Sequence, residues 1–332
     1  MSIPISAYPA PFNVTRASHV VLTVRDLAKS RAFYVDALGF VVSDEDARTL
    51  YLRGLEEACH HSLVLHQSSE PASCDRIGMR VYTEDDLERA KAVFDAAGLP
   101  ARWVDVPHQG KTLHVSDSVG TPLEFCARME TKPRLVVAFE QFRGRCPQRL
   151  DHVQILTPHV RRACEFYTSL GFRLSEYIAV DGTDDLVFCF LQRKGNPHDI
   201  VFAAGAGPRL HHFAFLVPDA AHLIHACDYA GSRGFSGSLE HGPARHGPGH
   251  ALFVYLRDPD GHRVELFTTH YQVMDIENEP VRWDLSYMRN RPWGFPPRQR
   301  WYEEASPFTG IAVEEPAVKP NPMTLEKLLL GQ

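Results

Sequence analysis

Two long stretches of the chain repeat the same order of apolar and polar positions. Residues 18–40 (SHVVLTVRDLAKSRAFYVDALGF) begin with alternating apolar residues and continue into a helical pattern, and residues 151–172 (DHVQILTPHVRRACEFYTSLGF) follow the same order. A period of two predicts a strand, and a period of 3.6 predicts a helix. Both stretches end on Leu-Gly-Phe, whose glycine we expect to cap the helix before the next strand. The repeat predicts two homologous domains, at residues 14–135 and 148–275.

Each predicted domain contains a second, weaker copy of the same pattern. One copy begins at RIGMRVYTEDDLERAKAVFDAAGLP and the other at LHHFAFLVPDAAHLIHACDYAGSRG. Every copy reads as a strand, a helix and then shorter strands, which predicts four βαβββ modules in an α+β fold. We expect each domain to be a curved mixed sheet that encloses a cavity, with helices on its outer face. Residues 276–332, rich in Pro, Trp and Arg, are expected to form an extended tail that packs near the active site and ends in a short helix.

Composition and charge narrow the classes of partner. The 332 residues are 44% hydrophobic and 23% charged, which is globular composition. A net charge of −6 and a pI near 6.3 provide no broad basic surface, so we expect neither nucleic acid nor a membrane as a partner, but a small molecule. No apolar run approaches the roughly 20 residues that span a bilayer, and the N-terminus does not read as a secretory signal. We therefore expect a cytoplasmic protein.

The cysteines do not point to a disulfide or thiolate chemistry. Their number, seven, is odd, and they are scattered without a C-x-x-C pair. This pattern argues against a disulfide framework and against a thiolate metal site. We expect the cysteines to be small buried apolar residues.

Two histidines and one glutamate of the second half form a candidate metal centre. His152 and His212 each begin the first strand of a module, and Glu265 lies on an apolar final strand. Two imidazoles and one carboxylate are the facial triad of non-haem Fe(II) oxygenases, which leaves coordination positions open. The spacing is not compact, but pseudo-symmetric modules bring equivalent strand positions to one cavity. The neighbouring His211 is the alternative to His212, because a one-residue shift turns a strand side chain to the opposite face.

The first half offers an internal comparison. It keeps His19 and Glu124, but the counterpart of His212 falls near Ile77. We therefore expect no metal in this domain and a structural role for His19. Two histidine pairs, His60-His61 and His222-His225, read as surface or helical residues without a function.

Other polar side chains of the second half are candidates for catalysis. His198 lies two residues before Ile200, the position that aligns with Glu265, and so on the face of the cavity, where an imidazole can act as acid and base. Tyr255 either points into the cavity, where it can donate to an anionic oxygen, or packs as an ordinary aromatic residue. The segment HGPARHGPGH carries His246 between Gly-Pro pairs, which predicts an irregular loop that covers the site. His246 and Arg291 are the candidates on the substrate side.

Several of these motifs together resemble one family. They are D-H-V at 151–153, R-K-G-x-x-H-D at 193–199, R-L-H-H-x-A-F at 209–215, R-H-G at 245–247 and Y-x-x-D-P-D-G-H-R-x-E at 255–265. Over residues 14–300 the chain is similar to the type I extradiol catechol dioxygenases of the vicinal oxygen chelate superfamily, and most of all to the homoprotocatechuate (3,4-dihydroxyphenylacetate) 2,3-dioxygenases.

The resemblance implies an activity, a cofactor and site residues. The activity is insertion of O2 into a catechol beside its hydroxyls to give a muconic semialdehyde, with Fe(II), or alternatively Mn(II), as cofactor. It implies His152, His212 and Glu265 as metal ligands, His198 as acid-base residue, and Tyr255 and His246 as further catalytic donors. Relatives of this kind are commonly tetramers, so a homotetramer is expected.

The substrate pocket departs from the pattern of the homoprotocatechuate enzymes. The resemblance points to five substrate-binding positions: Gln154, Phe190, His241, Arg291 and Trp301. Three of these differ from the pattern, because Gln154 stands where Asn is usual, Phe190 where Trp is usual, and His241 where an Arg is expected to hold the side-chain carboxylate of the substrate. Losing an Arg fork weakens bidentate carboxylate recognition.

Two other functions stay open on the sequence. The same modules could serve another metalloenzyme, such as a glyoxalase-like isomerase or a thiol transferase, which would need a further protein ligand. They could also form a metal-free binding protein. The retention of all three ligands in one half only argues against a metal-free binder.

Overall fold

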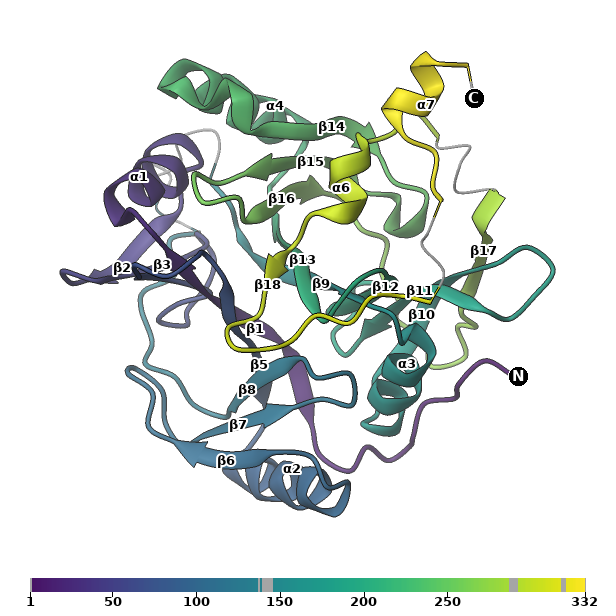
Figure 1. The fold of residues 1–332 in the computed structure, drawn as a ribbon. Helices are drawn as coiled ribbons and strands as arrows, with labels where there is room; N and C mark the ends of the chain where they lie inside the picture. Colours follow the sequence, from purple (N-terminus) through teal and green to yellow (C-terminus); the bar gives the residue numbers. More distant parts are fainter. Residues whose placement is uncertain (1, 137, 139–145, 287–291, 318–320, 332) are drawn as a thin grey trace.

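Two mixed β-sheets form the frame of the protein (Figure 1). The computed structural model describes residues 2–136, 138, 146–286, 292–317 and 321–331. In spatial order, the first sheet contains β2 (Val41–Glu45), β3 (Thr49–Arg53), β4 (Leu63–Gln67), β1 (Val14–Val24), β5 (Cys74–Val81), β8 (Pro122–Cys126), β7 (Thr112–Ser116) and β6 (Ala101–Val104). All of its strands come from the first half of the sequence.

The second sheet repeats this arrangement. In spatial order it contains β14 (Leu239–Arg245), β15 (Leu252–Arg257), β16 (Arg263–Thr268), β13 (Arg209–Leu216), β9 (Arg149–Thr157), β12 (Ile200–Ala204), β11 (Leu186–Gln192), β10 (Arg173–Ala179) and β17 (Val281–Asp284). The short β18 (Ser306–Pro307) pairs with β13. The α+β fold with four βαβββ modules is confirmed, and the tail adds β17 and β18 to the second sheet.

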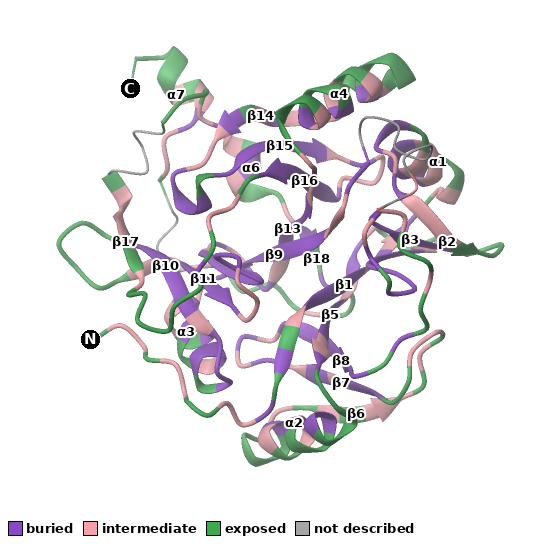
Figure 2. Cartoon of the chain, turned by 180° about the vertical axis from the view of Figure 1, so that it is seen from behind, coloured by how far each residue is buried: buried purple, intermediate pink, exposed green. Residues whose placement is uncertain are grey.

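One helix follows the first strand of each module. The helical elements are α1 (Leu27–Arg31), which continues into the π-helical η1 (Ala32–Ala37), α2 (Glu84–Ala96), α3 (Val160–Ser169), α4 (Ala220–Ala230), the short turns η3 (Gly231–Phe235), η4 (Ser236–Ser238) and η5 (Pro248–His250), and α6 (Gln299–Glu303) and α7 (Leu325–Leu329) in the tail. Figure 2 shows that the strands are mostly buried, whereas α2, α4 and α7 have exposed faces. The helices therefore cover the sheets from outside, as the sequence predicts.

The Leu-Gly-Phe signal works as a helix stop in both halves. Gly39 has φ 82° and Gly171 has φ 84°, which is the left-handed conformation that glycine adopts without steric cost. Phe40 and Phe172 follow at once and are buried. The glycine thus ends the helix and turns the chain back toward the core.

The two halves pack on each other through equivalent residues. Tyr34 of η1 donates a hydrogen bond to Asp258 of the second half (3.0 Å), and Tyr167 of α3 donates to Asp117 of the first (3.0 Å). Helical segments of the two halves also meet: Phe94 of α2 packs on Phe166 of α3, and Phe33 of η1 packs on Phe235 of η3. The internal repeat therefore provides the domain contact as well as the fold.

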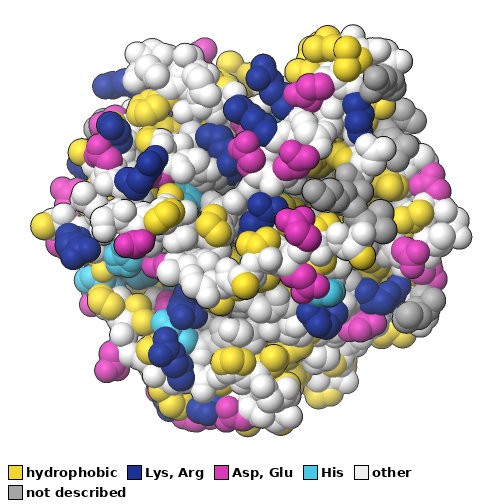
Figure 3. Space-filling model, in the orientation of Figure 1, with side chains coloured by type: hydrophobic (Ala, Val, Ile, Leu, Met, Phe, Trp, Pro, Cys, Tyr) yellow, Lys and Arg dark blue, Asp and Glu magenta, His cyan; other side chains and the backbone are white. Residues whose placement is uncertain are grey.

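The surface and the cysteines agree with the expectations from composition. Acidic and basic side chains are interspersed on the face drawn in Figure 3. All seven cysteines are free thiols, and all except the partly exposed Cys227 are buried. No helix within the described part of the chain combines the length and the apolar character that a bilayer crossing requires.

Candidate metal centre and active site

Three neighbouring strands carry the candidate ligands. The central strand β13 pairs with β9 on one side and β16 on the other, and its Ala214 lies opposite both His152 and Glu265. His212 stands two residues earlier on β13 and therefore faces the same side. The Nε2 atoms of His152 and His212 lie 3.3 and 3.1 Å from Oε2 of Glu265. One ligand atom from each of the three lies within 4.8 Å of the others, so the register brings the predicted triad together.

Hydrogen bonds on the outer ring nitrogens orient both imidazoles. Nδ1 of His152 lies 3.0 Å from the carboxylate of Asp151 and must donate to it. Nε2 of His211 donates to the carbonyl of Trp301 (2.8 Å), so Nδ1 of His211 accepts from Nδ1 of His212 (2.7 Å). Both His152 and His212 thus keep the lone pair of Nε2 for the shared centre, which is how metal-binding histidines are usually oriented. His211 serves as a support for His212.

The carboxylate of Glu265 is buried and ionised. Burial alone would raise its pKa, but the adjacent imidazoles of His152, His212 and His246 hold the pKa well below the usual range. Burial lowers the pKa of His212 to about 4, so this imidazole is neutral near pH 7. A buried anion that faces two imidazoles calls for a cation, and a divalent metal ion suits two nitrogens and one oxygen.

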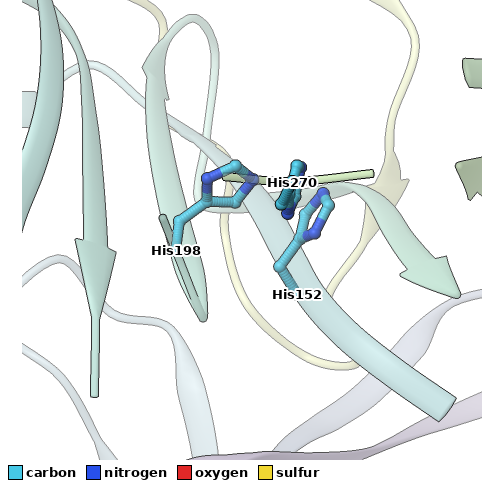
Figure 4. Close-up of side chains that lie close together, drawn as sticks. All are labelled: His152, His198 and His270. Carbon is cyan, nitrogen blue, oxygen red and sulfur yellow. The ribbon is translucent and has the colours of Figure 1, made fainter. Parts of the chain in front are cut away.

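A second group of imidazoles lies beside the triad. Figure 4 shows His198 and His270 turned toward His152. The ring centroid of His198 lies 4.3 Å from that of His152 and 4.8 Å from that of His270. Burial, with the neighbouring His152 and His270, lowers the pKa of His198 well below its usual value. Its buried Nδ1 has no hydrogen-bond partner among the described residues, so it is open to a ligand.

Tyr255 and His246 lie on the other side of Glu265. Tyr255 on β15 is directly opposite Glu265, and its hydroxyl lies 3.0 Å from Nε2 of His246. The same nitrogen lies 3.3 Å from Oε1 of Glu265. The ring of His246 stacks on Phe253 with centroids 3.6 Å apart. Of the two positions left open by the sequence, Tyr255 has the one that faces the cavity.

A cavity of about 860 Å³ opens onto these groups. Apolar strand residues form one wall, and residues of the tail also line the cavity. The apolar wall contains Ile178, Val187, Phe188, Phe190 and Val201, and the tail contributes Leu285, Pro296, Gln299, Trp301, Tyr302, Pro322 and Met323. Such a space is large enough for a substituted aromatic ring.

Comparison with known proteins gives the family. The model of the glyoxalase/bleomycin resistance protein/dioxygenase superfamily matches residues 16–125 and 149–266. The chain is 35% identical to the homoprotocatechuate 2,3-dioxygenase of Brevibacterium fuscum, whose structure superposes with a TM-score of 0.90 over 96% of this chain and 90% of that one. The chain is a type I extradiol dioxygenase of this superfamily.

Other relatives have the same class of activity. The Arthrobacter globiformis homoprotocatechuate 2,3-dioxygenase has a TM-score of 0.86 at 36% identity, covering 92% of this chain and 95% of that one. A manganese-dependent 2,3-dihydroxybiphenyl 1,2-dioxygenase of Geobacillus genomosp. 3 is 28% identical over 81% of this chain and 90% of its own length. A metapyrocatechase of Geobacillus stearothermophilus is 26% identical over 92% of this chain and 97% of its own length. His152, His212 and Glu265 form a divalent metal site of the extradiol type, for Fe or Mn.

Only some of the predicted substrate-binding residues of the dioxygenase line the cavity. Gln154, Phe190 and Trp301 line the cavity. His241 is not among its lining residues. Its ring packs behind the cavity wall, with centroids 5.9 Å from Tyr255 and 5.8 Å from Trp301. Arg291 lies outside the described residues.

Two residues at the site of the dioxygenase were missed by sequence reasoning. His270 follows the end of β16, after Thr269 with φ 67°, so no strand periodicity predicts its direction. Its Nδ1 lies 3.5 Å from the carboxylate of Asp151. Arg209 opens β13 and lines the cavity. Its signal was present in the Arg-Leu-His-His run, but a strand-end Arg is usually a surface residue.

Three expectations about other segments were wrong. His60 and His61 are buried, not on the surface. The segment 239–245 is strand β14, interrupted at a cis Gly242-Pro243 bond, so the predicted loop is in part regular structure. The counterpart of His212 is Arg76 and not Ile77, because Arg76 pairs with Val21 two residues after His19, as His212 pairs with Gln154 two residues after His152. A one-residue error in register moved the assignment to the core-facing Ile77.

In the first half, protein side chains form hydrogen bonds with the buried carboxylate of Glu124. Glu124 lies 2.8 Å from Nε2 of His19, 2.6 Å from Nε2 of His114 and 2.6 Å from the amide of Gln109. These hydrogen bonds, against the effect of burial, hold the pKa of Glu124 well below its usual range. His19 therefore has the structural role expected of it.

Proposed function

We propose that this dioxygenase cleaves 3,4-dihydroxyphenylacetate or a related substituted catechol beside its hydroxyls, and that it uses Fe(II) held by His152, His212 and Glu265. The product is a muconic semialdehyde. The observation that carries the proposal is the convergence of two oriented imidazoles and one ionised carboxylate, all buried, at the end of a cavity of about 860 Å³.

The ligand set suits the proposed metal. Among the described residues, the side chains in polar contact with Glu265 are imidazoles rather than Lys or Arg, so the buried charge is best balanced by a cation at the centre of the triad. When bound, the ferrous ion supplies adjacent positions for the two catechol oxygens and for O2 and lets charge pass between them.

The surrounding side chains handle protons and orientation. His198 is neutral and can take a proton from a catechol hydroxyl at Nδ1, then return it as an acid when the O–O bond breaks. Tyr255 can donate its hydroxyl hydrogen to a substrate oxygen, with His246 holding that hydroxyl in place. The apolar wall at Phe190 excludes water beside the ring.

The cavity also offers a cation for the substituent. Arg209 is the one Lys or Arg among the described residues that line the cavity, and its Nε donates to the carbonyl of Ala206 (2.8 Å). Its remaining guanidinium hydrogens suit a side-chain carboxylate. We propose that Arg209 takes over part of the role that the resemblance gives to an Arg at position 241.

A panel of catechols tests the proposal. The protein is loaded with Fe(II) without oxygen, then mixed with O2 and 3,4-dihydroxyphenylacetate, 4-ethylcatechol, catechol or 2,3-dihydroxybiphenyl, and the yellow product is followed by absorbance. We expect the highest kcat/KM with 3,4-dihydroxyphenylacetate. A higher value with a catechol that lacks a carboxylate would refute the substrate and keep the reaction. A parallel series loaded with Mn(II) tests the metal.

A further inference from the structure

A second group of metal-binding side chains lies in the first half, away from the catalytic strands. His60, His108 and Asp44 each offer one ligand atom, and these atoms lie within 4.8 Å of one another. Nε2 of His60 and Nε2 of His108 each lie 4.0 Å from Oδ2 of Asp44. None of the three takes part in the reaction proposed above.

The backbone holds the two histidines on a fixed frame. The amide of His60 donates to the carbonyl of Glu130 (2.8 Å), and the amide of Glu130 donates to the carbonyl of His108 (2.8 Å). Isolated bridges between Cys59 and Thr131 and between Gln109 and Met129 extend this pairing. Segments far apart in the sequence thus fix both imidazoles before any ligand arrives, which lowers the cost of binding.

The nitrogen of His60 that faces Asp44 has no partner. The side chain of His60 is 0% exposed, and its Nε2 makes no hydrogen bond to any described residue. A buried polar atom without a partner destabilises the folded state. A metal ion would use this lone pair and remove that cost.

The Nδ1 atoms of His60 and His108, which point away from Asp44, have the hydrogen-bond partners that are usual for metal-binding histidines. Nδ1 of His108 lies 3.1 Å from the carboxylate of Glu130, and Nδ1 of His60 lies 3.1 Å from Nδ1 of His61. A carboxylate on the outer nitrogen is the usual support of a ligating histidine. Burial, followed by the charge of His108, lowers the pKa of His60 to about 4, so this imidazole is a neutral ligand near pH 7.

We propose that Asp44, His60 and His108 bind a divalent transition-metal ion of the Zn(II) class, with water completing a four-coordinate site. Two imidazole nitrogens and one carboxylate oxygen are a common Zn(II) donor set. The rings of His60 and His108 are now stacked, with centroids 3.7 Å apart and planes 7° from parallel. Coordination requires His108 to tilt, which its partly exposed position on a turn permits. Through Asp44, the ion would link the exposed edge strand β2 to the segments that carry His60 and His108.

Metal counting tests this site beside the catalytic one. The Fe-loaded protein is dialysed against buffered free Zn(II), and Fe and Zn per chain are counted by mass spectrometry. We expect one Zn per chain with Fe retained. His108→Asn, chosen because Asn tolerates the φ of 65° at this position, should lose the Zn and keep the Fe. The matched control His225→Asn, at an exposed histidine of α4, should keep both.

Two further measurements guard against an indirect effect. Glu130→Gln should weaken Zn binding about 10–100-fold without removing a ligand. Zn should raise the Tm of the Fe-loaded wild type and not that of His108→Asn. Zn that only replaces Fe, no bound Zn, or equal Zn in His108→Asn and wild type would overturn the proposal, whatever the outcome of the catechol panel.

Discussion

At the scale of single residues, the candidate active site depends on which nitrogen of each imidazole carries the hydrogen. Asp151 accepts a hydrogen bond from Nδ1 of His152, and His211 accepts one from Nδ1 of His212, so the hydrogen of each ligand lies on Nδ1. These two supports are adjacent in sequence to the ligands they orient, so a strand with side chains on alternate faces contacts both the metal site and the groups behind it. This explains why each ligand, His152 and His212, directly follows the residue that orients it in the sequence.

Replacing Asp151 by Asn should weaken metal binding. The amide keeps the size of the side chain but removes the charge that favours the Nδ1 hydrogen of His152. We expect about a 10–100-fold loss of metal affinity, measured by competition with a fluorescent chelator. Asp184→Asn, at an exposed position, is the control. Equal affinity in both variants would show that the orientation of His152 does not depend on Asp151.

His198→Phe should separate metal binding from turnover. The ring fills the same space but has no nitrogen to move a proton, and His198 is not one of the triad ligands. We expect kcat to fall about 10²–10⁴-fold with a full metal content, from steady-state rates and metal analysis. Unchanged turnover would remove His198 from the reaction.

Arg209 offers a test of substrate choice. Arg209→Leu should raise KM for 3,4-dihydroxyphenylacetate about tenfold or more, because a charge-assisted hydrogen bond contributes about 1.5–3 kcal/mol. The KM for 4-ethylcatechol, which has the same shape without the carboxylate, should change little. A similar rise for both substrates would mean that Arg209 acts on the shape of the cavity and not on charge.

At the scale of elements, the internal repeat explains both what sequence reasoning finds and where it fails. The sequence predicts the modules through short local signals: His-Val at the start of the first strand, Phe-Tyr within the helix and Leu-Gly-Phe at the end of the helix. The position of Arg76 opposite Val21 is not local, since β1 and β5 contain shifts in register that no single strand reveals. Likewise β14 pairs with β15 in spite of its Gly242-Pro243 pair, because the neighbouring strand supplies the hydrogen-bond partner and so overrides the weak strand propensity of this segment.

The reciprocal Tyr–Asp bonds should contribute to the contact between the halves. Tyr167→Phe removes one of the donors to the buried carboxylate of Asp117, whose pKa burial raises to about 6. We expect a loss of about 1–3 kcal/mol in the free energy of unfolding, measured in urea. Tyr34→Phe at the equivalent bond to Asp258 should cost a similar amount, and Tyr82→Phe, at an exposed residue, should cost nothing. No loss in either buried variant would contradict this reading of the contact.

At the scale of the whole molecule, the cavity needs parts that are distant in the sequence. Strands of the second half supply the metal ligands, while tail residues within 296–303 and 321–323 complete the lining of the cavity. The tail is anchored because β18 pairs with β13, the strand that carries His212. The sequence indicates that the tail packs on the body, but its few apolar residues have no period that would tell which face it covers.

Buried neutral histidines should make the folded molecule sensitive to acid. Burial, with the neighbouring His19, lowers the pKa of His61 to about 2, whereas an unfolded histidine titrates near 6.5. The unfolded chain therefore binds a proton below about pH 6.5 that the folded chain excludes, so the contribution of His61 is complete above that pH and is lost as the pH falls. Between pH 6.5 and 5 the loss amounts to about 2 kcal/mol for this one residue. Urea unfolding across this range should show a smaller decrease for His61→Gln than for the wild type, while His225→Gln, at an exposed histidine, should follow the wild type; parallel curves for all three proteins would mean that His61 accepts its proton in the folded state.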